Sequence, residues 1–100
     1  MKNFRTYQLA VEFYKKSRNS NLKGNLRNQF DRASSSIVLN LAEGSGKFSS
    51  KDKCRFYKIA FGSLRECQSI LTITSNENTQ INKNLDILAG SLYKLIKATR

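Results

Sequence analysis

The chain contains no proline and no histidine, and it has only five glycines in 100 residues. Because proline interrupts a helix and interior glycine weakens one, the shortage of both permits long helices. Without histidine, neither a zinc site of the Cys/His type nor a Cys/His nucleophile pair has its partner residue. We therefore expect helical structure, and we expect no metal and no other cofactor.

Cysteine is also scarce, since Cys54 and Cys67 are the only two in the chain. If both lie on one helix, they stand roughly 20 Å apart along its axis, which is too far for a disulfide between them. We expect two reduced thiols, as is typical of the cytoplasm. The longest uncharged apolar patch, Ile37 to Ala42, is too short for a membrane span, and no secretory signal is visible.

Acidic residues are few: 7 Asp and Glu stand against 18 Lys and Arg, which gives a formal net charge of +11. A balance this positive favours a polyanionic partner, either nucleic acid or an anionic membrane surface. Hydrophobic residues make up 39% of the chain and charged residues 25%, close to the averages for globular proteins. We expect one domain that covers residues 1–100.

The apolar residues recur at helical spacing in four segments separated by short polar connections. The segments cover residues 4–17, about 26–43, about 49–74 and 81–99. Gly44 stands where a left-handed C-terminal cap would end the second segment, and Ser49 is placed to cap the third. The third segment has two adjacent rows, one through Ala60 and Leu64 and one through Ile59 and Ile73, so we expect it to pack against more than one neighbour. Short connections predict an all-α, antiparallel, up-down-up-down four-helix bundle.

Two motifs resemble a known family. RASSSIVLNLAEG at residues 32–44 and FYKIAFGSLRE at residues 56–66 are similar to the proteins encoded in intervening sequences of bacterial 23S ribosomal RNA genes. The positions that match the family pattern are Arg32, Ala33, Ser36, Ile37, Asn40, Ala42, Glu43, Gly44, Phe56, Ile59, Ala60, Gly62, Ser63, Leu64 and Glu66. Val38 departs from the pattern, because a proline is usual there.

The resemblance implies a left-handed four-helix bundle that associates into a ring, often a homopentamer. The chain is similar also to the accessory variability determinant proteins of diversity-generating retroelements. Those proteins form basic pentameric barrels that work with a reverse transcriptase and nucleic acid. The resemblance therefore implies a homo-oligomer as well as the fold.

Polar residues form a row beside the apolar face of the second segment. The row contains Gln29, Ser36, Asn40 and Glu43, with Arg32 at its edge. A row of this kind suits hydrogen bonds between helices or subunits, with Ser63 and Glu66 as partners and Gly62 allowing a close helix approach. The set expected to serve packing and assembly is Arg32, Ser36, Asn40, Glu43, Gly44, Gly62, Ser63 and Glu66.

A catalytic use of Glu43 and Glu66 as paired carboxylates is the alternative interpretation of this polar row. No nucleophile, phosphate-binding glycine loop or metal ligand set accompanies the two residues in the sequence. We therefore expect no catalytic residues and a protein that is not an enzyme.

Positive charges form a second row on the third segment. Lys51, Arg55, Lys58 and Arg65 are separated by four, three and seven positions, and Lys53 stands near them. The row begins at the N-terminal end of a helix, where the helix dipole disfavours cations, so the dipole does not explain it. We predict that these five residues contact phosphates and that Tyr57 adds a stacking surface, and a simple solvated face is the alternative.

These patterns lead to two hypotheses. The first is a non-enzymatic, oligomeric protein that binds RNA or DNA through phosphate contacts, with RNA favoured over DNA. The second is a protein-interaction scaffold, for example a ring that recruits a reverse transcriptase or another partner, whose charge keeps it in solution. Membrane binding is not expected, because no segment has a large apolar face left over for lipid.

Overall fold

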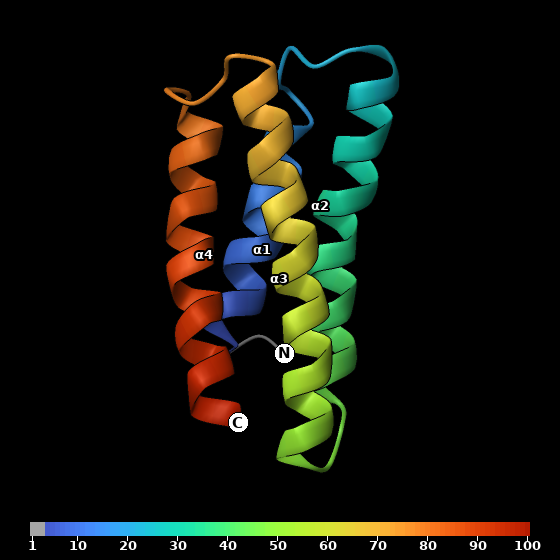
Figure 1. Cartoon of the computed structure of the whole chain (residues 1–100), viewed down its shortest axis with the longest axis vertical. Helices are drawn as coiled ribbons and strands as arrows, with labels where there is room; N and C mark the ends of the chain where they lie inside the picture. Colours follow the sequence, from blue (N-terminus) through green and yellow to red (C-terminus); the bar gives the residue numbers. More distant parts are fainter. Residues whose placement is uncertain (1–3) are drawn as a thin grey trace.

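The computed structural model describes residues 4–100, and all of its regular structure is helical in that range. The single domain expected over residues 1–100 includes residues 1–3, which lie outside this description. The four helices are α1 (Arg5–Ser17), α2 (Gly24–Ser45), α3 (Ser50–Ile73) and α4 (Gln80–Thr99). Figure 1 shows that consecutive helices run in opposite directions and are joined at alternating ends. The all-α, up-down-up-down arrangement is confirmed.

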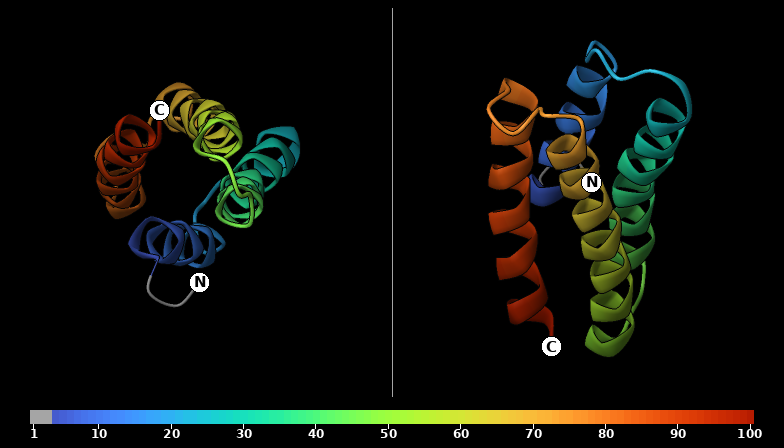
Figure 2. Two further views of the ribbon diagram at one scale, coloured as in Figure 1. Left: turned by 90° about the horizontal axis from the view of Figure 1, so that it is seen from below. Right: turned by 45° about the horizontal axis from the view of Figure 1, so that its top comes forward.

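The helices pack in chain order around a common axis. Each helix contacts the next one, and α4 closes the bundle by packing against α1. Figure 2 shows this arrangement along the bundle axis, with helices at opposite corners separated by the core. The most extensive interface lies between α2 and α3. It brings the two sequence motifs side by side.

The core is filled by apolar residues from all four helices. The rings of Phe13 and Phe30 pack with 5.9 Å between their centroids and join α1 to α2. Along α4, the apolar residues that recur at helical spacing in the sequence are buried at Leu85, Leu88 and Leu92. Full burial of each such side chain stabilises the fold by about 1.5–3 kcal/mol. The closed core fixes which face of each helix is left for other contacts.

The helix ends agree with the sequence in part. The hydroxyl of Ser49 accepts a hydrogen bond from the backbone N–H of Asp52 at 3.0 Å, so the predicted cap of α3 is confirmed. Helix α2 begins at Gly24, slightly before the expected start near Leu26. Arg27 in its first turn donates hydrogen bonds to the carbonyls of Ser17 and Leu22. These bonds hold the connection from α1 against α2.

Gly44 does not form the left-handed cap that the sequence suggested. Helix α2 continues through Gly44 to Ser45, and Gly46 at its end has a φ of −86°. Gly44 is needed for a close approach instead, because a Cβ there would lie 2.7 Å from Cε1 of Tyr57 on α3. The absence of a side chain at this position lets the Tyr57 ring pack against α2.

The second apolar row expected on α3 is only partly buried. Ile70 is buried, but Ile59 and Ile73 are 44% and 68% exposed. Helix α3 contacts both α2 and α4, as expected, and the row through Ala60 and Leu64 lies in the core. The second row also carries polar residues that contact α2, and it leaves Ile59 and Ile73 on the surface.

Both cysteines lie on α3 and are free thiols, as expected. Cys67 is completely buried in the core, whereas Cys54 is buried near the start of the helix. Loss of hydration raises the pKa of the Cys67 thiol to about 12, and the nearby Glu66 carboxylate adds to this shift. Cys67 is therefore an inert core residue at neutral pH.

Candidate nucleic-acid interface

A row of four cations runs along the outward surface of α3. Lys51, Arg55, Lys58 and Arg65 are all exposed, and we call these four residues the α3 stripe. Their spacing of four, three and seven residues places them within one face of a helix of 3.6 residues per turn. The structure therefore places four of the five predicted nucleic-acid contacts on one exposed surface.

The four residues of the α3 stripe form no ion pairs within residues 4–100. Four carboxylates pair elsewhere, in Lys16–Glu12, Arg27–Asp31, Arg32–Glu66 and Lys47–Glu43. The guanidinium carbon of Arg55 lies 4.7 Å from the centroid of the Phe56 ring, a contact that leaves its positive charge uncompensated. The charge of the stripe therefore remains available to an anionic ligand.

Lys53, the fifth predicted contact, has a different environment. Its ammonium group donates a hydrogen bond of 3.0 Å to the backbone carbonyl of Ser45. That carbonyl belongs to the last turn of α2, where free carbonyls attract positive charge. Lys53 is half-buried by this contact and ties the end of α2 to the start of α3.

Tyr57 cannot provide the stacking surface that the sequence suggested, because its side chain points into the bundle. The residue is only 3% exposed, and its ring packs on Phe4 with 6.1 Å between centroids. Loss of hydration raises the pKa of the Tyr57 hydroxyl. The prediction for Tyr57 was wrong.

Phe48 is an exposed aromatic residue near the α3 stripe and was not among the contacts predicted from the sequence. It lies in the turn between α2 and α3, with its side chain fully exposed. Lys47 beside it and Lys51 after it are cations. An aromatic residue between two lysines in a polar connection was the available sequence signal, because a base can stack on such a ring.

Gly62 also differs from its expected role. A Cβ built at Gly62 would meet no atom of residues 4–100 within 4 Å, so no helix in this range approaches α3 there. The residue is exposed and lies on the same face as Lys58 and Arg65. Close packing at Gly62 by another helix of the same chain is thus not found in the described range, whereas a role in assembly stays a prediction. The surface of α3 is open between Lys58 and Arg65.

The polar row on α2 meets α3 as the sequence suggested. The hydroxyl of Ser63 donates to the hydroxyl of Ser36 at 2.9 Å, and Asn40 donates to the Ser36 hydroxyl at 3.0 Å. Farther along, Arg32 and Glu66 form an ion pair at 3.4 Å. We call these contacts the α2–α3 seam, and they satisfy polar groups between two helices of the same chain.

The remaining residues of the polar row make other contacts. Glu43 pairs with Lys47 at 3.2 Å and so does not reach α3 as part of the seam. Gln29 is half-buried on α2. Because Glu43 and Glu66 each pair with a different cation, both carboxylates already have a structural partner. Among residues 4–100, no cluster of three His, Cys, Asp or Glu side chains is placed to hold a metal ion.

None of the helices found within residues 4–100 is long and apolar enough to cross a membrane. No curated protein sequence matches the chain. A family model described as 23S rRNA-intervening sequence protein matches residues 4–99. The match covers all four helices and both sequence motifs that carried the resemblance. The chain therefore belongs to the 23S rRNA-intervening sequence protein family.

Proposed function

We propose that this protein is a non-enzymatic, oligomeric nucleic-acid-binding protein that contacts phosphates through the α3 stripe, with RNA favoured over DNA. The observation that carries the proposal is the exposed row of four cations without ion-pair partners within residues 4–100. Lysine and arginine contacts to phosphate release counterions and supply affinity that depends weakly on base sequence. The excess of 11 positive charges supports the same ligand class.

The salt dependence of binding tests this proposal. The variant Lys51→Glu/Arg55→Glu/Lys58→Glu should bind structured RNA more weakly than the unmodified protein. The plot of log K against log salt has a negative slope, and each lost phosphate contact makes it less steep by about 0.7–0.9. For three lost contacts we expect the slope to become less steep by roughly 2–3. Fluorescence anisotropy titrations over a salt series, with a transcript of a 23S intervening sequence as the first probe, measure both quantities.

A matched control separates a local site from general attraction. Lys15→Glu/Lys23→Glu/Lys83→Glu removes three exposed cations outside the α3 stripe and lowers the net charge by the same amount. It should weaken binding only slightly and leave the salt slope unchanged. Equal losses of affinity and slope in the two variants would contradict a site on α3.

We also propose that the chain forms a homo-oligomer, with a pentamer as the expected form. Support comes from large apolar side chains exposed on the described surface, Leu39 on α2 and Ile59 on α3 among them. A ring would multiply the α3 stripe and raise the affinity for a long polyanion without a stronger single site. In sedimentation velocity, Leu39→Glu should give a smaller particle, whereas Asn28→Glu on the exposed surface of α2 should not. An unmodified protein that sediments as a monomer would contradict the proposal.

The second candidate function is a protein-interaction scaffold, for instance one that recruits a reverse transcriptase. The exposed apolar residues favour it, because such side chains also suit contacts with a different protein. Affinity capture from the native cell with and without nuclease distinguishes the two functions. Partners that are lost with nuclease support nucleic-acid binding, and partners that survive it support the scaffold.

A further inference from the structure

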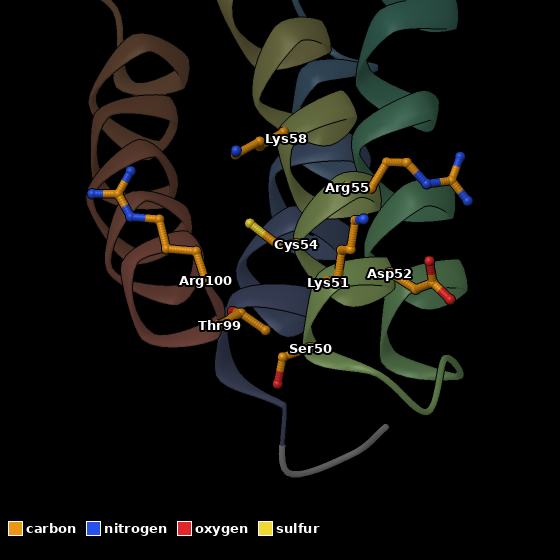
Figure 3. A pocket seen from close by; sticks show the side chains of 8 residues that line it. All are labelled: Ser50, Lys51, Asp52, Cys54, Arg55, Lys58, Thr99 and Arg100. Atoms are coloured by element: carbon orange, nitrogen blue, oxygen red, sulfur yellow. The ribbon is translucent and has the colours of Figure 1, made fainter.

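A recess of about 500 Å³ lies beside the α3 stripe, between the first turns of α3 and the end of α4 (Figure 3). Lys51 and Lys58 line it from α3, and Arg100 lines it from the end of α4. Cys54 contributes an uncharged thiol to its wall and is only 5% exposed. The lining therefore combines cations from two segments with a single acidic residue, Asp52.

The side chains around the recess point in different directions. Figure 3 shows Lys58 and Cys54 extending from α3 toward α4, whereas Arg55 and Asp52 extend to the other side of α3. The acidic group of the lining thus points away from α4, and Lys58 is the cation directed into the space between the helices. An anion in the recess would meet the lysine and avoid the carboxylate.

The ends of the two helices affect an anion in opposite ways. The first turn of α3, which begins at Ser50, has backbone N–H groups without acceptors in its own helix, and these favour an anion. The last turn of α4 has free carbonyls that repel an anion, although Lys97 and Arg100 supply positive charge at that end. With Lys51 and Lys58 added, the positive groups outnumber the negative ones around the recess.

We propose that this recess binds a terminal phosphate and the adjoining nucleotide of a nucleic-acid strand, an inference that rests on the proposed function. A recess of about 500 Å³ is much too small for a double helix, but it has the size of a site for a small ligand and can take the end of a strand. A phosphate monoester carries a charge of about −1.5 to −2, more than an internal diester, and gains more from clustered cations. Lys51 and Lys58 begin about 10 Å apart along α3, which suits one phosphate at each end of a nucleoside.

Three RNAs of one single-stranded sequence test the proposal by fluorescence anisotropy: one with a 5′-phosphate, one with a 3′-phosphate and one with hydroxyls at both ends. One phosphorylated form should bind about tenfold more tightly than the hydroxyl form, because charged hydrogen bonds contribute that much. Lys58→Gln and, independently, Lys51→Gln should abolish this preference. Arg65 belongs to the α3 stripe but lies outside the recess. Arg65→Gln should therefore weaken the binding of all three RNAs by the same factor and keep the preference for the phosphorylated form.

Several results would overturn the inference. Equal affinity for the three RNAs would exclude a terminal-phosphate site while leaving phosphate contacts along α3 intact. A preference that persists in both Lys58→Gln and Lys51→Gln would place the site elsewhere. Displacement of the labelled RNA by an equal concentration of inorganic phosphate would show that the recess takes the free anion. No binding of any of the RNAs would contradict the proposed function itself.

Discussion

Two sides of α3 use polar residues in different ways. On the side that faces α2, Ser63 and Glu66 contact Ser36 and Arg32. On the outward side, cations such as Lys58 have no carboxylate partner within residues 4–100. Polar groups on the α2 side of α3 are paired and support packing of the helices. The cations on the outward side are unpaired, as the proposed phosphate contacts require.

The largest expected effect is a loss of stability at alkaline pH, caused by Cys67 on the buried side of α3. The pKa of Cys67 is about 12 in the folded chain against 9.0 for an ordinary thiol, so below pH 9 the thiol is neutral in both states. Between pH 9 and 12 only the unfolded state loses this proton, so stability falls as pH rises, by about 4 kcal/mol from this group. Urea unfolding across this range measures the loss.

The variant Cys67→Val removes the titrating thiol and tests this assignment. Its free energy of unfolding should change less with alkaline pH than that of the unmodified chain. Some dependence should remain, because burial also raises the pKa of Tyr57. Parallel pH curves for the two proteins would contradict the assignment to Cys67.

The next largest effect is expected when glycine is replaced by alanine at two positions, one packed against another helix and one on an open surface. Gly44→Ala places a Cβ 2.7 Å from the Tyr57 ring and should lower the free energy of unfolding by about 2 kcal/mol. Gly62→Ala meets no atom within 4 Å and should raise it by about 1 kcal/mol, because alanine favours helix. Urea unfolding of the two variants side by side measures this difference. Changes of the same sign would show that the two positions do not differ in packing.

A smaller effect belongs to the α2–α3 seam. Ser63→Ala removes the donor to Ser36 and should cost about 1 kcal/mol of unfolding free energy. A double-mutant cycle with Ser36→Ala isolates the coupling between the two hydroxyls. Additive effects of the two substitutions would show that this bond contributes nothing of its own.

The smallest expected effect is that of Arg32→Ala. The side chains of Arg32 and Glu66 are 73% and 42% exposed, so solvent and salt screen their attraction. The loss of stability should stay below about 0.5 kcal/mol at physiological salt and shrink further as salt is raised. If Arg32→Ala lowered the free energy of unfolding more than Ser63→Ala does, the ion pair would be the stronger of the two seam contacts, contrary to expectation.

Much of the fold followed from the sequence because local spacing decides it. The helical spacing of apolar residues predicted the buried faces of α2 and α4, and Ser49 predicted the start of α3. The pairing of the α2 row with Ser63 and Glu66 was also predictable, because both motifs placed their polar residues at helical spacing.

Other features depend on contacts between segments, and spacing alone does not reveal them. Gly44 looked like a cap because its need for space comes from Tyr57 on another helix. Tyr57 looked like a surface residue because its burial depends on Phe4 and on the rotation of α3. The recess was missed for the same reason, since Arg100 reaches it only when α4 returns beside the start of α3.

A titration of isotope-labelled protein with single-stranded RNA, followed by amide chemical shifts, shows directly where RNA binds. If it binds at the α3 stripe and the recess, the largest shifts should fall on the outward residues of α3 between Lys51 and Arg65 and on the end of α4 around Arg100. The amides around Ser36 on α2 should change little. Shifts concentrated on α1 and α2, with α3 unaffected, would contradict binding at the α3 stripe.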